Sequence, residues 1–534
     1  MASPFQVVVA YDLRTRGIGA NGRIPWNVPE DRAYFRGVTT DVRDPQRHNA
    51  VVMGRATYDS LAGLNRPLPG RSNLVLSRTG AYRSLDAALA SDAARVAETV
   101  FVIGGEAVYR EALASPHCVA VHVTEVELPE EPEPPRFDRF FPALDAAAFA
   151  LWSADASARR SRTGARYRRL TFVRREALGS LRLPVSVPPH PERAYLDLVR
   201  ATLELGVARR DRTGTGTRST FGAQVRFSLR DGLFPLLTTK RVFFRGVLEE
   251  LLWFVRGSTD ARELAATGVH IWDANAVAHA KRHGLPEAGP LGPVYGWQWR
   301  RFGAPDPPVG PSETAKSGGG VDVDPSKSSK SGGGVDVDPP KNPLKSGGGV
   351  PQGIDASGAC PQGIDASGAC PQGIDQLAEV LRLVREDPAS RRNVLTAWNP
   401  VDLSRMALPP CHLLAQFWVG GEGEGEGELS CMVTMRSCDL GLGLPFNIAS
   451  YALLAHMVAA AAGLPVGDLV LSLGDAHVYD DHVEALTGQL KRPPRPFPRL
   501  RPLPARERLE DYVASDFAIE GYDPHPSVPM AMSV

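Results

Sequence analysis

The chain of 534 residues is too long for one compact core, and ordinary domain sizes predict roughly two to four folded units. Apolar residues make up 43% of the chain and charged residues 22%, which is a globular composition, and 60 basic against 60 acidic side chains give a formal net charge of zero. This balance argues against nucleic acid or an anionic membrane as the primary partner.

The cysteine pattern and the N-terminus indicate where the protein works. Six cysteines show no zinc-site spacing, so we predict no metal site and a reducing compartment. The N-terminal MASPFQVVVAYD leads directly into an expected strand, without the basic flank and cleavable core of a signal peptide, and no apolar run reads as long enough to span a bilayer. We therefore expect a soluble, cytoplasmic protein with no membrane partner.

The first expected elements place an acid on the apolar face of a helix. A buried strand over Gln6–Tyr11 precedes the glycine-rich loop RGIGANGRIPW, and a helix is predicted from Pro29, because proline favours a helix start. Asp31, Tyr34 and Phe35 have i, i+3, i+4 spacing, so the carboxylate shares the apolar face. Such an acid suits a ligand with an amidine-like edge, while a helix-start acid that stabilises the dipole fits the pattern equally well.

Two glycine turns follow strands in this half of the chain. Expected strands over Val51–Gly54, Asn73–Ser77 and Thr99–Gly105 repeat a strand-then-turn rhythm that indicates an α/β sheet. The turns GRAT and GGEAVY leave main-chain N–H groups free to hold phosphate oxygens, although a simple tight turn is the commoner explanation of each. Together with Arg55, Ser77 and Arg78 they suit a phosphorylated dinucleotide.

Several motifs between Met1 and Arg175 resemble dihydrofolate reductase: IPWNVPED, VVMGRATYDSL, RPLPGRSNLVLSR, VFVIGGEAVY and the VTEV strand. The resemblance implies a mixed sheet with flanking helices, and Asp31 as the residue that binds the pteridine and promotes protonation of its N5. Thr124 would support Asp31, and Arg71 would hold the folate α-carboxylate. The remaining implied residues are Ile24, Trp26 and Phe35 for folate, and Ala10, Ile18, Gly19, Gly54, Arg55, Thr57, Ser77, Arg78, Gly104, Gly105 and Tyr109 for the cofactor NADPH.

A proline-rich joint and low-complexity stretches divide the rest of the chain. LGSLRLPVSVPPHPE should be extended, which predicts a first domain over 1–176, a linker over 177–190 and a second domain over 191–534. Repeats of SGGGVDVDP and PQGIDASGAC offer too little apolar surface to order, so we expect a disordered insertion over 304–375, and EGEGEGE should extend a hairpin tip. Both stretches should tolerate deletion.

The second domain is organised around Leu408–Tyr451. Cys411 follows two prolines, whose rings fix the preceding backbone, and a strand-like apolar run follows it, so we expect the thiol to be presented rather than buried at random. Arg436, in an RSCD cluster, would lower the pKa of a nearby thiol and can also hold a phosphate. A cysteine alone would indicate only a small buried residue, but the arginine favours a nucleophile with an anion site.

Other positions in this domain carry weaker signals. Arg212, in the loop RRDRTGTGTRSTFG, suits a phosphate, although a surface charge is the ordinary explanation of one arginine. Glu250 lies among apolar neighbours on an expected helix, where burial would raise its pKa and let it transfer protons; a satisfied helix acid is the alternative. The adjacent Arg391 and Arg392 would point opposite ways on a strand, which disfavours one shared anion in their own subunit.

Motifs from Pro191 to Val534 resemble thymidylate synthase in family order: DRTGTGT, FPLLTTKR, LEELLWF, IWDAN, LGPVYGWQWR, SRRNVLTAWNP, PPCH, RSCD, LGLPFNIASYALL and GDAHVY. The resemblance implies an α+β domain in which the Cys411 thiolate adds to C6 of dUMP, so that C5 attacks the methylene of 5,10-methylenetetrahydrofolate. The implied dUMP-binding residues are Arg212, Arg391, Arg392, Cys411, His412, Arg436, Ser437, Asp439, Asn447, His477 and Tyr479. Glu250 and Tyr295 would handle protons, and the folate would face Trp272, Asn275 and Asp439.

The two resemblances together imply one bifunctional enzyme. The synthase would release dTMP and dihydrofolate, and the reductase would return dihydrofolate to tetrahydrofolate with NADPH; the short linker resembles the kinetoplastid form of the fused enzyme. Arg391 and Arg392 would reach the partner's nucleotide phosphate, so a homodimer through the synthase domain is implied. Met435 replaces the glutamine that the family usually shows before RSCD, which predicts an altered nucleotide affinity.

Two rival interpretations stay open at this point. Thymidylate synthases can also resemble translational repressors, but the neutral charge and the lack of a basic-aromatic stripe argue against RNA as the primary partner. The second alternative is that one domain is an inactive scaffold. Separate substitutions of Asp31 and Cys411 would discriminate, because each should remove only its own reaction.

Overall fold

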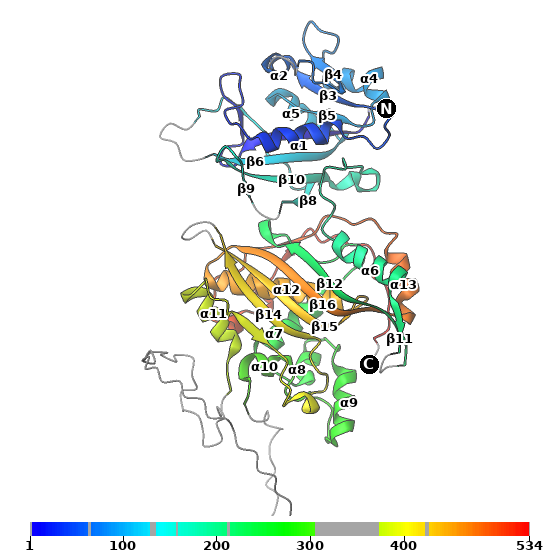
Figure 1. The fold of residues 1–534 in the computed structure, drawn as a ribbon, viewed down its shortest axis with the longest axis vertical. Coiled ribbons are helices and arrows are strands. Elements are labelled where there is room, and N and C mark those ends of the chain that lie inside the picture. Colours follow the sequence, from blue (N-terminus) through cyan, green and yellow to red (C-terminus); the bar gives the residue numbers. More distant parts are fainter. Residues whose placement is uncertain are drawn as a thin grey trace, which may run out of the picture.

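The computed structural model describes most of the chain, and Figure 1 shows it as two units stacked along the long axis. The described residues are 3–61, 66–128, 135–155, 158–210 (without the side chains of 179 and 180), 214–304, 373–421 and 427–532. Most of the predicted insertion, Arg212 and most of the EGEGEGE run lie outside the described residues.

The first unit is built on an eight-stranded sheet in the order β4-β3-β5-β1-β6-β10-β8, with β9 paired to β10. Neighbouring strands from β4 to β6 pair in parallel, while β10 is antiparallel to β6, β8 and β9. This confirms the mixed sheet predicted from the sequence. The strands are β1 (Phe5–Asp12), β3 (Asn49–Gly54), β4 (Arg71–Leu76), β5 (Val100–Val102), β6 (Cys118–Glu127), β8 (Phe149–Ala154), β9 (Arg159–Arg160) and β10 (Arg166–Arg174), with β2 (Gly17–Gly19) and β7 (Arg139–Phe140) as a separate pair.

Helix α1 (Pro29–Thr40) carries the predicted acid and packs on this sheet. Pro29 stands in the first turn, and Asp31 places negative charge near the positive end of the helix dipole. The helix is anchored by Tyr34 and Val38, which join a buried cluster with side chains of β1 and β3. The other helices of this unit are α2 (Arg55–Ser60), α3 (Leu85–Leu89), α4 (Asp92–Val96) and α5 (Glu106–Ala114).

The second unit is built on a six-stranded sheet in the order β11-β12-β16-β15-β14-β13. The pair β15 and β16 is parallel and the other pairs are antiparallel. The strands are β11 (Val207–Arg209), β12 (Thr217–Ser228), β13 (Val394–Thr396), β14 (His412–Gly420), β15 (Glu428–Asp439) and β16 (Val466–Tyr479), with β17 (Arg499–Leu500) and β18 (Ile519–Glu520) as a separate pair. The helices are α6 (Arg193–Leu205), α7 (Phe244–Val255), α8 (Ala261–Ala266), α9 (Asp273–His283), α10 (Tyr295–Arg301), α11 (Gln376–Glu386), α12 (Gly443–Ala462) and α13 (Val483–Gln489).

Helix α12 is the central helix of the second unit and corrects one expectation from the sequence. It has 20 residues and is apolar enough to cross a membrane by length and composition, whereas no such run was expected. It packs against β15 and β16, and 72% of an apolar 18-residue window lies buried inside the fold. Because its apolar surface is covered by the sheet and neighbouring helices, α12 is a core helix of this unit.

The two units meet at a packed joint rather than at a free linker. The chain leaves β10 through a 3-10 helix, η2 (Arg175–Ser180), and then runs without helix or strand, as its prolines predict. His190 is buried between Trp152 of the first unit and Phe497 of the second, with ring centroids 4.7 and 4.9 Å away. An aromatic cluster therefore joins the two cores.

An ionic contact also crosses the joint. Arg168 of β10 donates to Asp231, in the 3-10 helix η3 (Arg230–Gly232) of the second unit, at 2.8 Å. The same guanidinium pairs with Glu125 of β6 at 2.8 Å, and Glu125 accepts a hydrogen bond of 3.2 Å from the Tyr11 hydroxyl. This chain of contacts ties the centre of the reductase-like sheet to the second unit.

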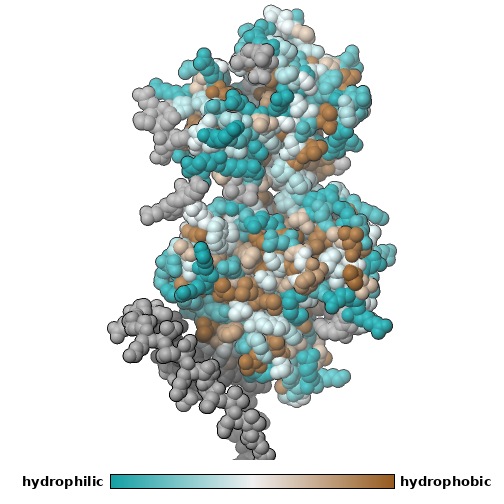
Figure 2. All heavy atoms as spheres, in the orientation of Figure 1, coloured by the Kyte–Doolittle hydropathy of each residue, from teal (hydrophilic) through white to brown (hydrophobic). Residues whose placement is uncertain are grey.

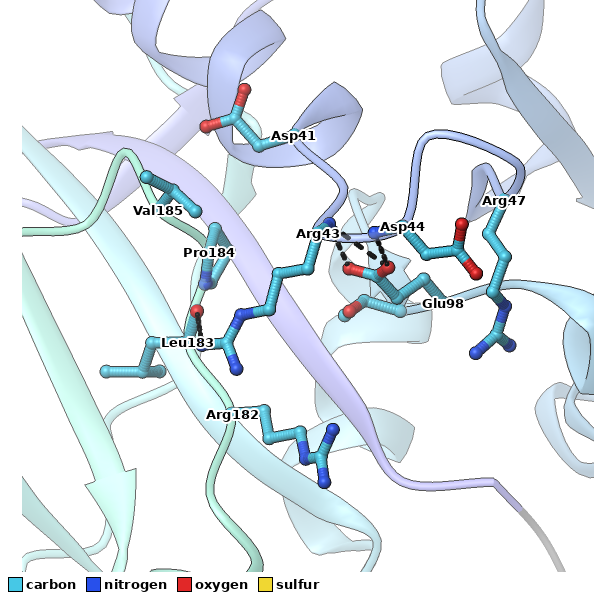
Figure 3. A pocket seen from close by; sticks show the side chains of 10 residues that line it. Asp41, Arg43, Asp44, Arg47, Glu98, Arg182, Leu183, Pro184 and Val185 are labelled. Atoms are coloured by element: carbon cyan, nitrogen blue, oxygen red, sulfur yellow. Dashed lines mark hydrogen bonds between the residues drawn. The ribbon is translucent and has the colours of Figure 1, made fainter.

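A charged cavity of about 300 Å³ marks where the joint segment passes over the first unit, as Figure 3 shows. Glu98 accepts hydrogen bonds from the main-chain N–H groups of Arg43 and Asp44, and Arg43 donates to the carbonyl oxygen of Leu183 at 3.2 Å. The residues that line the cavity are Asp41, Arg43, Asp44, Arg47, Glu98, Thr99, Arg182, Leu183, Pro184 and Val185. These contacts fasten the joint segment to the surface of the first unit.

The two ends of the predicted insertion meet in the fold. Phe302 and Ile374 form an antiparallel bridge with N···O distances of 3.0 and 2.9 Å. Gly373 has a positive φ of 72°, and a Cβ there would lie 2.5 Å from the carbonyl oxygen of Arg301, so this position needs glycine. The described residues on either side of the insertion therefore lie side by side.

We expect a chain that lacks residues 305–372, closed by a short glycine-serine linker, to keep both unit structures and both activities. The bridge already holds the ends together, and the entropy of loop closure changes by only about 0.6 kcal/mol per doubling of loop length. Thermal unfolding and enzyme rates should match those of the full chain. A deletion that also removes Gly373 and Ile374 should lower the melting temperature, and loss of activity in the first deletion alone would contradict this expectation.

Candidate active sites

The predicted acid of the first unit lies between α1 and β6. Asp31, in the first turn of α1, is hydrogen-bonded by Thr124 of β6, and Thr124 pairs in register with Ala10 of β1. Burial raises the pKa of the Asp31 carboxyl, while the Thr124 hydrogen bond and the positive charge of Arg169 oppose that rise. The structure thus brings three predicted residues together around a carboxyl that is suited to proton exchange.

A guanidinium lies farther along the same helix. Arg71, at the start of β4, donates to Thr39 Oγ1 at 2.5 Å, and its Cζ lies 5.8 Å from the centroid of the Phe35 ring. Phe35 follows Asp31 by four residues, so both side chains share one face of α1. An acid, an apolar ring and a cation therefore line one stretch of α1, an order that suits an elongated ligand with a carboxylate at one end.

The loop side of this site is more open. Trp26 packs against Phe137 at a centroid distance of 6.1 Å, which encloses one side of the loop. Ile24, predicted to line the same site, is 64% exposed. Ile18 and Gly19 lie on β2, which pairs with β7 at the edge of this loop. The described loop therefore places Trp26 in a packed position and leaves Ile24 accessible to a ligand.

Two glycines at the start of α5 form a narrow cradle beside β3. The Gly54 N–H donates to the carbonyl oxygen of Gly104 at 2.8 Å. A Cβ on Gly104 or Gly105 would lie 3.3 or 3.2 Å from Thr57 Oγ1, so side chains here would fill the cradle. The nine-residue helix α5 begins directly after Gly105, and the N–H groups at a helix start attract phosphate oxygens.

Polar groups flank this cradle. Arg55 and Arg78 are exposed, and Ser77 is half-buried directly after β4. The Tyr109 hydroxyl of α5 is buried and donates to the carbonyl oxygen of Val8 at 2.9 Å, which fixes α5 on the sheet. A glycine cradle next to two exposed guanidinium groups fits a phosphorylated dinucleotide such as NADPH.

The predicted nucleophile of the second unit lies beside a guanidinium. Cys411 directly precedes β14, and its main-chain N–H donates to the Tyr295 hydroxyl at 2.7 Å. Nη2 of Arg436, on β15, lies 4.0 Å from the Cys411 sulfur and donates to the carbonyl oxygen of Pro409 at 2.8 Å, while Nε donates to that of Pro410 at 2.9 Å. Because these carbonyls are neutral, they leave the positive charge beside the sulfur, where it favours a thiolate.

An aromatic layer backs the nucleophile. Tyr295 and His412 stack with ring centroids 3.9 Å apart, and His412 Nδ1 shares a hydrogen bond of 2.7 Å with the Tyr451 hydroxyl. Burial lowers the pKa of His412 to about 3, so its ring is neutral near pH 7. Tyr451 was missed from the sequence, although it follows Asn447 by four residues on α12 and therefore shares its face.

Glu250, the predicted proton carrier, borders a small cavity behind this layer. Its carboxylate accepts a hydrogen bond of 2.7 Å from Trp272 Nε1, and burial raises its pKa to about 7. The cavity, of about 10 Å³, has room for roughly one water molecule. Its lining residues are Glu250, Leu251, Phe254, Trp299, His412, Asn447, Ser450 and Tyr451. An acid that changes protonation near neutral pH thus lies near Asn447.

Asp439 organises the start of α12. Its carboxylate accepts hydrogen bonds of 2.7, 3.0 and 3.1 Å from the consecutive N–H groups of 441–443, which a helix start leaves free. Asp439 pairs in register with His477 of β16, and the His477 and Tyr479 rings lie 5.3 Å apart. Ser437 precedes Asp439 by two residues on the same strand. The structure therefore gathers these four predicted residues at adjacent ends of β15 and β16.

Other predicted residues of this unit lie apart from the nucleophile. Arg391 and Arg392 are exposed before β13, where Gln416 of β14 donates to the Arg391 carbonyl oxygen at 3.4 Å. Within the part of the chain that the structure describes, no recorded contact links them to Cys411. Asn275 is half-buried on α9.

Comparisons with known proteins identify both units. The thymidylate synthase family model matches residues 193–534, and the dihydrofolate reductase family model matches residues 4–174. The bifunctional dihydrofolate reductase-thymidylate synthase 1 of Arabidopsis thaliana is 40% identical over 568 residues, which covers 99% of this chain and 96% of the relative. The bifunctional proteins of Zea mays and Leishmania major are each 39% identical, covering 99% of this chain and 97% and 95% of the relatives. The chain therefore belongs to the bifunctional dihydrofolate reductase-thymidylate synthase family, and it converts dUMP to dTMP with 5,10-methylenetetrahydrofolate and reduces the resulting dihydrofolate with NADPH.

Proposed function

We propose that Cys411 is the nucleophile of the synthase reaction. Its thiolate bonds to C6 of dUMP, and the electron pair displaced from the C5–C6 double bond makes C5 a nucleophile toward the methylene carbon of the co-substrate. Loss of the C5 proton, transfer of a hydride from the folate co-substrate to the methylene carbon and cleavage of the S–C6 bond then release dTMP and dihydrofolate and return the thiolate. The observation that carries this proposal is the 4.0 Å approach of the Arg436 guanidinium to the Cys411 sulfur.

We infer the nucleotide contacts from the chemistry of the predicted residues of this unit. The Asn447 amide can both donate and accept, so it matches the uracil edge and disfavours cytosine. The phosphate is assigned to Arg436, Ser437 and Arg212, the ribose to His477 and Tyr479, and the base edge to Asn447, with His412 behind it. The folate is assigned to Trp272, Asn275 and Asp439. Arg212 rests on the sequence alone, because it lies outside the described residues.

Glu250 and Tyr295 are assigned to proton transfer. Because Glu250 changes protonation near neutral pH, the dependence of the synthase rate on pH tests this assignment. With its pKa raised to about 7, the carboxyl is mostly neutral below that pH and ionised above it. We expect the synthase rate to change with an inflection near pH 7, and Glu250→Gln to remove the inflection and lower the rate by about 10²-fold. The pH–rate profile of the reductase, measured on the same variant, is the control. An inflection retained in Glu250→Gln would contradict the assignment.

In the reductase unit, Asp31 is assigned to the pteridine and to promoting protonation of its N5. Thr124 orients the carboxyl by its hydrogen bond, and Arg71 pairs with the folate α-carboxylate. The site is completed by Ile24, Trp26 and Phe35 for folate, and by Ala10, Ile18, Gly19, Gly54, Arg55, Thr57, Ser77, Arg78, Gly104, Gly105 and Tyr109 for NADPH. When bound, NADPH supplies the reducing equivalents, and Arg55 and Arg78 favour its additional phosphate.

We also propose a homodimer formed by the six-stranded sheet. One face of this sheet packs on α12, while the other exposes Trp418 (61%) and Met432 (37%). Figure 2 shows hydrophobic side chains on the face of the lower unit where the strands lie in front of α12 in Figure 1. Arg391 and Arg392 lie beside this face, because Gln416 of β14 contacts Arg391. An exposed apolar face flanked by two exposed arginines supports a shared synthase site.

Subunit complementation tests the shared site. We expect Cys411→Ser and the double variant Arg391→Ala/Arg392→Ala each to lose synthase activity as homodimers. Mixed under exchange conditions, they should recover about a quarter of wild-type activity, since half of the dimers are mixed and each of those has one complete site. Mixing Cys411→Ser with a variant that also lacks Cys411 is the control. Failure to recover activity in verified mixed dimers would mean that the arginines do not serve the partner.

We further propose the domain limits 1–176, 177–190 and 191–534, and a cytoplasmic location. The limits are supported by the family matches, which end at 174 and begin at 193. The location is supported by the cysteines of the described residues, which are free thiols and fit a reducing compartment. Fractionation of source cells tests the location.

A further inference from the structure

A cation outside the predicted site lies on the helix turn that carries Asp31 and opposite the residue that hydrogen-bonds it. Arg169 of β10 pairs in register with Thr124, the residue that hydrogen-bonds Asp31. Its guanidinium carbon lies 4.4 Å from the centroid of the Tyr34 ring, and Nη2 donates to the carbonyl oxygen of Glu30 at 3.2 Å. Arg169 is therefore fixed on the first turn of α1, the turn that carries Asp31.

Within the part of the chain that the structure describes, no carboxylate forms an ion pair with the Arg169 guanidinium. Its Nε is buried without a hydrogen-bond partner. Asp155 accepts the main-chain N–H of Arg169 at 3.2 Å, but its carboxylate pairs with Arg159 at 3.1 Å. Burying a cation against aromatic rings and a carbonyl oxygen costs free energy unless the cation also faces a negative charge.

Of the groups that act on the Asp31 carboxyl, Arg169 is the main charge that is shielded from solvent. Arg32 lies on the same helix and is exposed to solvent, which screens its effect. The hydroxyls of Tyr34 and of Tyr109, from α5, are neutral at physiological pH, because burial raises the pKa of Tyr34 to about 12 and that of Tyr109 further. Thr124 contributes a hydrogen bond without a charge.

We propose that Arg169 is a positioning residue of the reductase, which holds Asp31 as an oriented carboxylate and so sets the pH range of dihydrofolate reduction. The proposal rests on the assignment of Asp31 as the residue that promotes substrate protonation. A positive charge from β10 favours the ionised carboxyl, so the proton leaves Asp31 at a lower pH than burial alone would allow. Arg169 acts through Asp31, and no contact between Arg169 and the substrate is needed.

The test is the pH–rate profile of the reductase in charge-removing and charge-keeping variants. In Arg169→Met, the midpoint of the alkaline fall in kcat/KM should move up by about one pH unit, because the carboxyl keeps its proton longer. Arg169→Lys should return the midpoint toward that of the wild type. Arg166→Met, on the opposite face of the same strand, is the matched control and should leave the midpoint unchanged.

Three outcomes would overturn the proposal: an unchanged midpoint in Arg169→Met, an equal shift in the methionine and lysine variants, or an equal shift in the control. Synthase activity of the same chain reports whether each variant is folded, and Arg169→Gln replaces Arg169→Met if the latter does not fold. Asp31→Asn separates the two claims. If it leaves reduction intact, the assignment of Asp31 fails; if it abolishes reduction while the Arg169 midpoint stays fixed, only the role of Arg169 fails.

Discussion

Replacing Cys411 with serine is expected to abolish dTMP formation while dihydrofolate reduction continues at its normal rate. A serine hydroxyl stays protonated near neutral pH and is a much weaker nucleophile than a thiolate, so the synthase rate should fall on the order of 10⁴-fold. The substitution changes one atom, and the bond to the Tyr295 hydroxyl comes from the main chain, so it is kept. The loss should therefore fall on the chemical step rather than on nucleotide binding.

Absorbance at 340 nm measures both reactions of this variant in one cuvette. With dUMP and methylenetetrahydrofolate, the wild-type signal should rise as dihydrofolate forms and fall only after NADPH is added. The Cys411→Ser signal should stay flat in the first phase, and should fall normally when dihydrofolate and NADPH are supplied. Cys431→Ser, in the same sheet, is the control and should retain the first phase. A first phase that persists in Cys411→Ser would rule out this thiol as the nucleophile.

Replacing Asp31 with asparagine should produce the opposite pattern. The amide keeps the size of the side chain and can still contact Thr124, but it cannot take up a proton or carry a negative charge. General acid–base assistance typically contributes about 10²–10⁴-fold, so reduction at neutral pH should fall by that factor. The deficit should shrink as the pH is lowered, because solvent then protonates the substrate without help from the protein.

The decisive comparison for Asp31→Asn is the reductase rate from acidic to neutral pH, beside the synthase rate of the same preparation. An unchanged synthase rate shows that the substitution acts locally. Asp92→Asn, an exposed acid on α4, is the matched control and should leave both rates unchanged. A deficit in reduction that is the same at every pH would indicate a lost contact rather than a lost proton function.

The local parts of both sites could be predicted from the sequence. The i, i+3, i+4 spacing of Asp31, Tyr34 and Phe35 placed the acid on the packed face of α1, because helix geometry depends only on neighbours along the chain. The approach of Arg436 to Cys411 followed from two strand-like runs joined by a short hairpin, which β14 and β15 form. Both inferences relied on the regular spacing of side chains along one helix or across one pair of adjacent strands.

Long-range contacts could not be predicted in this way. Arg169 reaches the first turn of α1 only because β10 pairs with β6, and pairing register over more than forty residues leaves no local pattern. The stacking of His412 on Tyr295 similarly joins residues more than a hundred positions apart. The apolar character of α12 extends around the whole helix, so its composition alone cannot separate a buried core helix from a membrane span.

The aromatic joint affects how the fused enzyme can change in evolution as well as how it is held together. Because His190 packs on both Trp152 and Phe497, either half expressed alone would expose an apolar surface that evolved to be covered. A substitution at His190 would therefore change the packing of both units at once. Recombination that separated the two halves would therefore uncover this joint in both of them.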